Sequence, residues 1–332
     1  MAQLFTLRSD EVTARITDFG GNLVSVETPD RRGRHDHVLL GFEDVAGYVD
    51  NHGSFGALLG RNANRIAGGH IVVDGQSYTL AKNEPNSTLH GGPLGFGKLF
   101  WSVIDADTNR LRLTLDSEDG DQGFPGEVHA AATYELTGDT LRLLFEASTT
   151  RPTPLTLSAH PYFNLDGPEA RDCLDHEVQI FAAHFLPTDA AQIPTGELYP
   201  VAGTPFDFLQ PRRIGERIRT DHSQLRIGHG YDHYFVLPDD TFGTLRLAAR
   251  VEAAHSGRVL EILTTQRGLQ FYSGNNLNGS ANGRGGLYRQ SAGFAFEPQG
   301  FPDAPNQPNF PSTILRPGET YREEIAYRFR VR

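Results

Sequence analysis

Two residues of this sequence carry ionisable side chains in surroundings where such side chains can perform acid–base chemistry. Glu297 ends the apolar run Gly293-Phe294-Ala295-Phe296, and a proline follows it. Partial burial raises the pKa of a carboxyl group and so brings a general base toward neutrality, although a paired structural acid would fit the same pattern. His160 ends an alternating run and precedes Pro161-Tyr162-Phe163-Asn164. Histidine titrates close to neutral pH, so His160 is a second candidate for proton transfer.

Two further polar segments contain groups that can bind a ligand. Residues 60–66 include Asn64 and Arg65, which offer an amide and a guanidinium group, although either arginine of this segment could instead pair with a carboxylate. Residues 83–92 end in His90 followed by two glycines, where backbone can approach a ligand closely. Taken alone, each segment also fits a purely structural role.

Two accessory segments combine amides or carboxylates with aromatic rings. Asp232 lies between tyrosine and histidine at the start of an apolar strand, and Gln270 belongs to the segment Gly268–Asn275, which contains Phe271 and Tyr272. Carboxylates and planar amides can bridge neighbouring sugar hydroxyls, while aromatic rings cover the C–H face of a sugar. Both segments are therefore candidates to line a sugar site.

The composition excludes several classes of partner. The chain has 332 residues and a formal net charge of -11, which disfavours nucleic acid because a nucleic-acid surface needs cationic groups to neutralise phosphates. A neutral small molecule is the more natural ligand. The N-terminal residues lack an apolar signal-peptide core, and no stretch approaches the length of a membrane span, so we expect a cytoplasmic protein without a membrane partner. The lone cysteine, Cys173, is expected to be a small buried or idle thiol.

The elements that must position these residues are predicted to be strands. Alternating or β-branched runs recur at 12–16, 23–26, 71–73, 78–80, 111–115, 245–251 and 259–263. Asp74-Gly75 lies between two such runs and suits a two-residue type I′ hairpin, and further turns are expected at 137–139 and 255–257. Only residues 211–218 offer a weak helical segment.

These patterns predict an all-β fold, a large antiparallel β-sandwich with very little helix. No repeat, low-complexity tract, charge run or linker divides the chain. We therefore expect residues 1–332 to form a single β-sandwich domain, with its site among the loops at the sheet ends or in a groove on one sheet face.

Six segments together resemble the aldose 1-epimerases, or galactose mutarotases. In chain order they are Asn64-Arg65, Leu89-His90-Gly91-Gly92, His160-Pro161-Tyr162-Phe163-Asn164, Tyr231-Asp232-His233, Gln270-Phe271-Tyr272, and Pro302-Asp303-Ala304 with Asn306-Gln307-Pro308-Asn309-Phe310. They occur in the order found in that family and cover nearly the whole chain. Several unrelated segments would have to agree by chance for the resemblance to be accidental.

The resemblance implies a galactose mutarotase-like supersandwich that acts on free aldohexoses such as galactose or glucose without a cofactor or metal. It implies that Glu297 is the base and His160 the acid. It also implies that the sugar is bound by Asn64, Arg65, His90, Asp232 and Gln270. The expected binding partner is a small-molecule aldose. The protein itself is expected to be a monomer or a homodimer.

Anomer exchange by such a pair requires ring opening and reclosure. Glu297 would take the proton of the C1 hydroxyl group, and His160 would give a proton to the ring oxygen. Histidine's ordinary pKa near 6.5 would allow this donation at physiological pH. Rotation about C1–C2 would then expose the other aldehyde face, and ring closure would reverse both transfers.

Other functions remain open at this stage. A non-catalytic carbohydrate-binding or sugar-sensing protein could use the same sandwich, because fold does not fix function. An epimerase for phosphorylated hexoses would need a cationic pocket, for which Arg212, Arg213, Arg217 and Arg219 are candidates, although a solvated surface fits them better.

Metal-dependent hydrolysis and nucleotide binding are disfavoured. The His35-x-His37 pair has no second ligand set with convincing spacing, and His176-Glu177 lacks the further histidine of a zinc-protease helix. Residues 120–126 are glycine-rich, but no strand-to-helix unit surrounds them.

Overall fold

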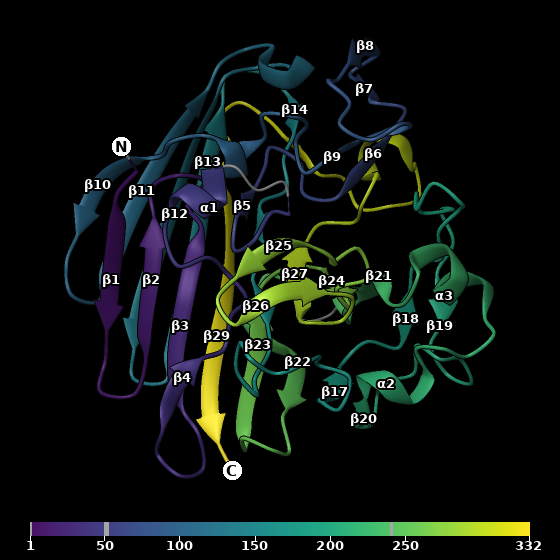
Figure 1. Ribbon diagram of the computed structural model, residues 1–332. Coiled ribbons are helices and arrows are strands. Elements are labelled where there is room, and N and C mark those ends of the chain that lie inside the picture. Colours follow the sequence, from purple (N-terminus) through teal and green to yellow (C-terminus); the bar gives the residue numbers. More distant parts are fainter. Residues whose placement is uncertain (1, 50–52, 240–241) are drawn as a thin grey trace.

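A nine-stranded antiparallel sheet is the largest element of the computed structural model, which describes residues 2–49, 53–239 and 242–332 (Figure 1). The last strand in the sequence, β29, lies in the middle of this sheet, between β13 and β23. In spatial order the strands are β10 (Ser102–Ala106), β11 (Arg110–Ser117), β12 (Val128–Thr137), β13 (Thr140–Thr149), β29 (Tyr321–Val331), β23 (Arg258–Thr264), β22 (Arg246–Glu252), β17 (Glu177–Ile180) and β20 (Arg212–Arg213).

Two smaller antiparallel sheets accompany it, one at the left and one at the right of Figure 1. The four-stranded sheet contains β1 (Leu4–Arg8), β2 (Thr13–Thr17), β3 (Leu23–Pro29) and β4 (His35–His37). The six-stranded sheet has the order β16 (Tyr162–Phe163), β27 (Phe294–Gln299), β24 (Gly268–Tyr272), β21 (Asp232–Val236), β18 (His184–Phe185) and β19 (Tyr199–Pro200).

Both smaller sheets pack against the nine-stranded sheet through one large hydrophobic cluster. Tyr134 of β12 donates a hydrogen bond from its hydroxyl group to the carbonyl oxygen of Gly21, in the turn between β2 and β3. On the other side, the ring centroid of Phe163 in β16 lies 5.6 Å from that of Tyr327 in β29. The layers share buried side chains, and the predicted antiparallel β-sandwich is confirmed.

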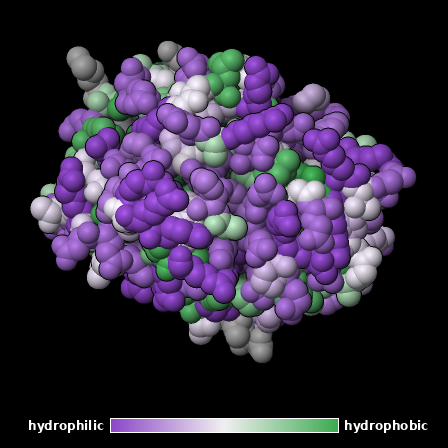
Figure 2. All heavy atoms as spheres, turned by 60° about the horizontal axis from the view of Figure 1, so that its bottom comes forward, coloured by the Kyte–Doolittle hydropathy of each residue, from purple (hydrophilic) through white to green (hydrophobic). Residues whose placement is uncertain are grey.

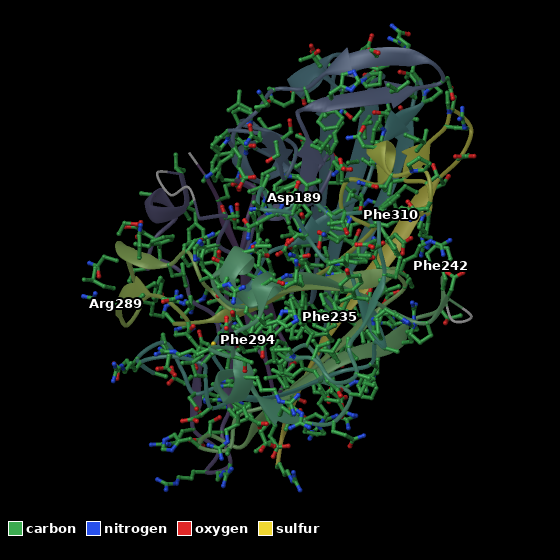
Figure 3. All side chains as sticks on the ribbon, turned by 90° about the vertical axis from the view of Figure 1, so that its right-hand side faces the viewer. Asp189, Phe235, Phe242, Arg289, Phe294 and Phe310 are labelled. Carbon is green, nitrogen blue, oxygen red and sulfur yellow. The ribbon has the colours of Figure 1, made fainter. Side chains whose placement is uncertain are left out.

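Alternation along the six-stranded sheet separates a hydrophobic face from a polar one. Phe271 and Phe296 are register partners on β24 and β27, and their stacked rings lie 4.9 Å apart. Figure 3 shows Phe235 and Phe294 in the interior, where both are fully buried. Because side chains alternate along a strand, the neighbouring residues Gln270 and Glu297 point to the opposite face.

The predicted hairpin at Asp74-Gly75 is confirmed. It joins β7 (His70–Val73) to β8 (Gln76–Thr79), and both turn residues have positive φ, 50° at Asp74 and 80° at Gly75, as a type I′ turn requires. The other short strands are β5 (Leu58–Leu59), β6 (Arg65–Ala67), β9 (Ser87–Leu89), β14 (Thr153–Pro154), β15 (Ser158–Ala159), β25 (Asn278–Gly283), β26 (Gly286–Arg289) and β28 (Ile314–Leu315).

Helices are short in the described residues. The weak helical segment at 211–218 contains one turn, α2 (Ile214–Arg217). Further short helices were not expected from the sequence: α1 (Ala46–Val49), α3 (Ser223–Gly228) and the 3-10 turns Phe96–Lys98, Asp121–Gly123 and Ala304–Asn306. The N-cap of helix α3 is His222, which is not one of the common N-cap residues. Its imidazole accepts the capping hydrogen bond from the backbone N–H of Gln224.

The surface is mainly polar. On the face in Figure 2 hydrophilic residues predominate, and hydrophobic ones occur in small separate groups. Cys173 is fully buried, as expected for a small structural thiol. Within the part of the chain that the structure describes, no helix has both the length and the apolar character needed to cross a membrane.

Candidate active site

Six of the seven predicted site residues line one cavity of about 180 Å³. It opens on the polar face of the six-stranded sheet, where β21 and β27 meet loops from elsewhere in the chain. The lining residues are Gly53, Ser54, Asn64, Arg65, Leu89, His90, His160, Tyr162, Asp232, Tyr272, Asn276 and Glu297. A larger cavity, of about 410 Å³, lies beside Phe242 and contains none of the predicted site residues.

The two predicted proton-transfer residues lie together in this cavity. The Nε2 atom of His160 is 3.4 Å from the Oε1 atom of Glu297. Both residues are buried, with exposed fractions of 5% for His160 and 2% for Glu297. The Oε2 atom of Glu297 is also buried and has no protein hydrogen-bond partner. Leaving a buried carboxylate oxygen without a hydrogen-bond partner costs folding free energy. A ligand in the cavity could supply the missing partner.

Burial shifts the two pKa values in opposite directions. It raises the pKa of Glu297 well above its usual value, and the nearby Asp232 adds to this shift while Arg65 opposes it. Burial lowers the pKa of His160 to about 4, so the ordinary pKa assumed from the sequence is wrong for this site. A raised pKa is what the sequence indicated for Glu297. Together the shifts favour a neutral pair, with one proton on Glu297, over an ion pair.

Short strands on both sides fix the position of His160. The residue follows β15, which pairs with β5, and it precedes Pro161 and β16, which pairs with β27. Its backbone N–H donates to the carbonyl oxygen of Ala57, and its carbonyl oxygen accepts from Gly56, both at 2.9 Å. Its ring lies against Tyr162, with centroids 4.6 Å apart. The imidazole is therefore held in one place.

Arg65 and His90 are brought together by the pairing of β6 with β9. Arg65 is the register partner of Leu89, and His90 follows directly. The backbone N–H of Asn64 donates to Nδ1 of His90 at 3.1 Å. Gly91 has a φ of 88°, and a Cβ atom there would lie 1.9 Å from the carbonyl oxygen of Gly60. This glycine is thus required by backbone packing.

His90, His160 and Glu297 also form the one group in the described residues whose ligand atoms are close enough to hold a metal ion, within 4.8 Å of one another. The donor set is a poor fit for that role. Because Nδ1 of His90 accepts a hydrogen bond from Asn64, a neutral His90 ring carries its proton on Nε2. That nitrogen then donates a hydrogen bond and has no lone pair for a metal.

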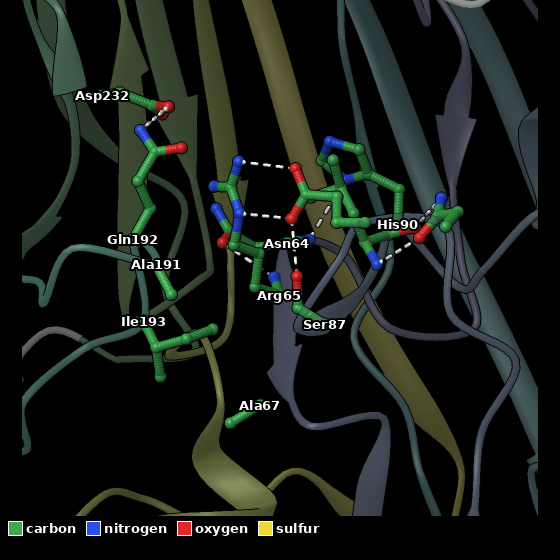
Figure 4. Close-up of polar contacts among 12 residues, drawn as sticks. Asn64, Arg65, Ala67, Ser87, His90, Ala191, Gln192, Ile193 and Asp232 are labelled. Atoms are coloured by element: carbon green, nitrogen blue, oxygen red, sulfur yellow. Dashed lines mark hydrogen bonds and ion pairs between the residues drawn. The ribbon is translucent and has the colours of Figure 1, made fainter. Parts of the chain in front are cut away.

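Arg65 is oriented by a two-pronged ion pair. Its Nε atom lies 2.8 Å from Oε2 of Glu84, and its Nη2 atom lies 3.0 Å from Oε1 (Figure 4). The hydroxyl group of Ser87 donates to the same carboxylate at 2.6 Å. Burial alone would raise the pKa of Glu84, but Arg65 holds it below its usual value. Glu84 thus fixes the guanidinium group against the cavity.

Asp232 begins β21 and is held by amide donors. The Nε2 atom of Gln270 donates to Oδ1 of Asp232 at 2.7 Å. Gln270 is not among the residues that line the cavity, so the structure shows it supporting Asp232. Burial raises the pKa of Asp232, whereas Arg65 and the hydrogen bond from Gln270 oppose this shift.

Some lining residues were not named individually as site residues. Tyr272 belongs to the segment Gly268–Asn275, which the sequence indicated as a candidate to line a sugar site, and strand alternation places it on the same face as Gln270, two residues before it. Tyr162 is similarly marked by its place after His160. Ser54, with a φ of 55°, and Asn276 lie in loops and have no local sequence pattern that indicates a site.

The arginines considered for a phosphate pocket and the histidine considered for a zinc site both make structural contacts instead. Arg212 lies 2.8 Å from Oε1 of Glu216, and Arg213 lies 3.5 Å from Asp175, as in a solvated, paired surface. His176 is buried, and its Nε2 atom accepts a hydrogen bond from the backbone of Leu165.

The antiparallel sandwich and its buried carboxyl–imidazole pair define a class of protein that can move protons within a small polar ligand. A family model described as aldose 1-epimerase matches residues 3–328. The chain is 42% identical over 328 residues to galactose mutarotase of Rattus norvegicus, covering 98% of this chain and 94% of that protein. It is 38% identical over 331 residues to aldose 1-epimerase of Escherichia coli (strain K12), covering 98% and 95%.

The fold is also similar to that of a solved structure. The crystal structure of the GalM/aldose epimerase homologue from C. elegans matches with a TM-score of 0.92 and 28% identity, covering 100% of this chain and 99% of that one. The chain belongs to the aldose 1-epimerase family.

Proposed function

We propose that this protein is a mutarotase that interconverts the α and β anomers of free aldohexoses such as galactose and glucose. One observation carries the proposal. A buried carboxyl group and a buried imidazole lie 3.4 Å apart in a polar cavity, in a chain whose relatives are named galactose mutarotase and aldose 1-epimerase. Ring opening needs one group to take the O1 proton and another to protonate the ring oxygen, and this pair can supply both.

In this mechanism Glu297 acts as the base and His160 as the acid, so the reacting form is the ion pair, which is the less populated of the two one-proton forms of the free site. When Glu297 takes the O1 proton and His160 releases its own to the ring oxygen, the charged pair becomes a neutral pair. Burial raises the pKa of Glu297 and lowers that of His160, so it favours the arrangement reached when the ring opens. Rotation about C1–C2 and the reverse transfers then give the other anomer, and the site returns to its starting state.

The surrounding residues bind the sugar. Arg65 and Asp232 line the cavity with opposite charges, and Asn64 and His90 add polar groups. Guanidinium and carboxylate groups together can bind hydroxyls as acceptors and donors. Tyr162 and Tyr272 add aromatic surface for the C–H groups of the ring.

Polarimetry on freshly dissolved α-galactose and α-glucose tests this function. The protein should accelerate the decay of optical rotation to the same end point as the uncatalysed reaction. A non-catalytic sugar-binding protein is the alternative, and exchange NMR between anomers separates the two. Saturable binding without faster anomer exchange would favour the binding protein and contradict the mutarotase.

We further propose that the chain forms one domain. The main hydrophobic cluster contains residues from all three large sheets, from Leu7 near the start to Phe329 near the end. The expected span, 1–332, includes residues 1, 50–52 and 240–241, which lie outside the described residues. Limited proteolysis that yields two stable, separable halves would contradict a single domain.

A further inference from the structure

Both carboxylate oxygens of Asp232 accept hydrogen bonds from glutamine amides that come from different parts of the chain. Gln270, on the neighbouring strand β24, donates to Oδ1 at 2.7 Å. Gln192, in the loop between β18 and β19, donates to Oδ2 at 3.1 Å (Figure 4). Gln192 does not line the cavity, so any influence it has on a bound ligand passes through Asp232.

A tight turn aims the side chain of Gln192. The residue has a φ of 60°, and its backbone N–H donates to the carbonyl oxygen of Asp189 at 2.9 Å. The Oδ1 atom of Asp189 accepts from the backbone of Ala191 at 2.8 Å and of Ile193 at 3.0 Å. This one carboxylate therefore closes the turn around Gln192 and fixes the direction in which its side chain leaves the backbone.

The base of the same loop is anchored next to Asp232. The buried side-chain amide of Gln224 makes two hydrogen bonds to the backbone of Thr188. It accepts one from the N–H group of Thr188 at 2.7 Å and donates one to the carbonyl oxygen of Thr188 at 2.8 Å. The Oε1 atom of Gln224 also lies 3.1 Å from Nε2 of His233, the residue that follows Asp232. On the other side, Gln307 donates to the carbonyl oxygen of Pro194 at 3.1 Å. The loop is ordered by folding, so Gln192 loses little further freedom when it holds Asp232.

The contact also affects the charge of Asp232. Burial raises the pKa of this carboxyl group, and the hydrogen bonds from Gln270 and Gln192 act against that shift, together with the charge of Arg65. An ionised carboxylate has about four acceptor positions, of which the two glutamines use two. An ionised and oriented Asp232 can therefore still accept hydrogen bonds from sugar hydroxyls.

We propose that Gln192 is a positioning residue for sugar recognition, holding Asp232 in the orientation that binds hydroxyl groups away from the reacting carbon. This inference rests on the proposed mutarotase function. Because Asp232 would bind hydroxyls that do not react, the loss of Gln192 should weaken sugar binding and leave proton transfer by Glu297 and His160 intact.

The first test replaces the donor with a side chain of similar length. Gln192→Met should raise KM for galactose roughly tenfold, the scale of one hydrogen bond to a charged group, and change kcat by less than about twofold. Gln179→Met is the matched control, since Gln179 is a half-buried glutamine that donates to the carbonyl oxygen of Leu209. Its KM should equal that of the unmodified protein. In an Asp232→Asn background, Gln192→Met should add little further increase in KM.

The second test is a pH profile that a purely structural role would not produce. Gln192→Glu puts a second carboxyl group against Asp232 with nearly the same shape. At pH 8 two like charges should repel, so KM should be at least tenfold above that of the unmodified protein. Near pH 5 the introduced carboxyl group can hold a proton and donate it to Asp232, so KM should return toward that of the unmodified protein.

The outcomes separate this inference from the proposed function. If the unmodified protein does not accelerate anomer exchange, the mutarotase function fails. If it does, and Asp232→Asn raises KM while Gln192→Met leaves KM unchanged, only the role of Gln192 is overturned. A loss confined to kcat in Gln192→Met, or a KM of Gln192→Glu that is equally high at pH 8 and pH 5, would also overturn it.

Discussion

Gln270 and Glu297 are register partners across β24 and β27, so the residue that supports Asp232 sits directly beside the proposed base. Two carboxyl groups are thereby held on the same face of one sheet. The negative charge of Asp232 adds to burial in raising the pKa of Glu297. The strand ladder that holds Asp232, the proposed sugar-binding carboxylate, therefore also helps to raise the pKa of Glu297, the proposed base.

Glu297→Gln should lower kcat by roughly 10²- to 10⁴-fold, because the amide keeps the shape of the side chain and cannot accept the O1 proton. Folding should be spared, since the substitution removes a buried carboxyl group whose Oε2 atom has no protein partner. Polarimetry measures the first effect and thermal unfolding the second. A mutarotation rate close to that of the unmodified protein would contradict the assignment of Glu297 as the base.

His160→Asn should lower kcat by a similar factor, because asparagine can fill the place of the ring but cannot protonate the ring oxygen. The measurement is turnover from pH 6 to pH 8. Glu135→Gln, at an exposed position of β12, is the control, and its turnover should equal that of the unmodified protein. Turnover close to normal across this range would move the acid role to His90, whose ring centroid lies 5.7 Å from that of His160.

The pH dependence of kcat/KM should follow the shifted pKa values. The active pair holds one proton, so activity should fall on the acid side only as pH drops through the pKa of His160, about 4, and on the alkaline side as pH rises through the raised pKa of Glu297. Activity should therefore stay on a plateau as the pH falls through 6.5 and decline only as it approaches 4. Initial rates at low substrate concentration measure this profile, and an acid limb centred near 6.5 would show that His160 titrates as an ordinary histidine.

Glu84→Gln should raise KM about tenfold and leave kcat within about twofold. The substitution removes the charge that holds the guanidinium group of Arg65, and a hydrogen bond between charged groups is worth roughly 1.5 to 3 kcal/mol. Saturation curves for galactose give both constants. A variant in which kcat falls and KM does not change would contradict a role of Arg65 in binding.

The contribution of the buried histidines to stability should fall as the pH is lowered from about 6.5 toward 4, whereas buried carboxyl groups with raised pKa values, such as Glu297 and Asp232, act in the opposite direction. Burial lowers the pKa of His160 and His176 to about 4 and that of His233 to about 3. Over this interval the unfolded chain binds protons that the folded chain does not, so each of these histidines lowers the free energy of unfolding by about 1.4 kcal/mol per pH unit. Urea unfolding at pH 7, 6 and 5 measures the slope. His233→Gln should reduce it, because it removes one of the three buried histidines.

The sequence predicted the strands and the fold class well, because these depend on local alternation. The runs expected at 71–73 and 78–80, for example, correspond to β7 and β8, which are joined by the expected turn, although β8 ends at Thr79. The division into three sheets was not predictable, because pairings such as that of β29 with β13 join segments far apart in the sequence. Local patterns contain no information about such partners.

The site was predictable only as a set of residues. The resemblance to a known family named the acid, the base and their neighbours, and six of these seven residues line one cavity. The pKa of His160 was predicted wrongly because it depends on burial, to which segments far away in the sequence contribute, such as the strand of Glu297. Gln192 was missed, since an amide in a turn has no signature until the loop is folded against Asp232.

The central place of β29 has a consequence for folding during synthesis. This strand joins β13 on one side to β23 on the other, and it leaves the ribosome after both of them. Until it emerges, the nine-stranded sheet exists only as two separate parts with exposed edges, which are prone to pair with other chains. We therefore expect the nascent chain to depend on chaperones until β29 is released, and to fold slowly after that.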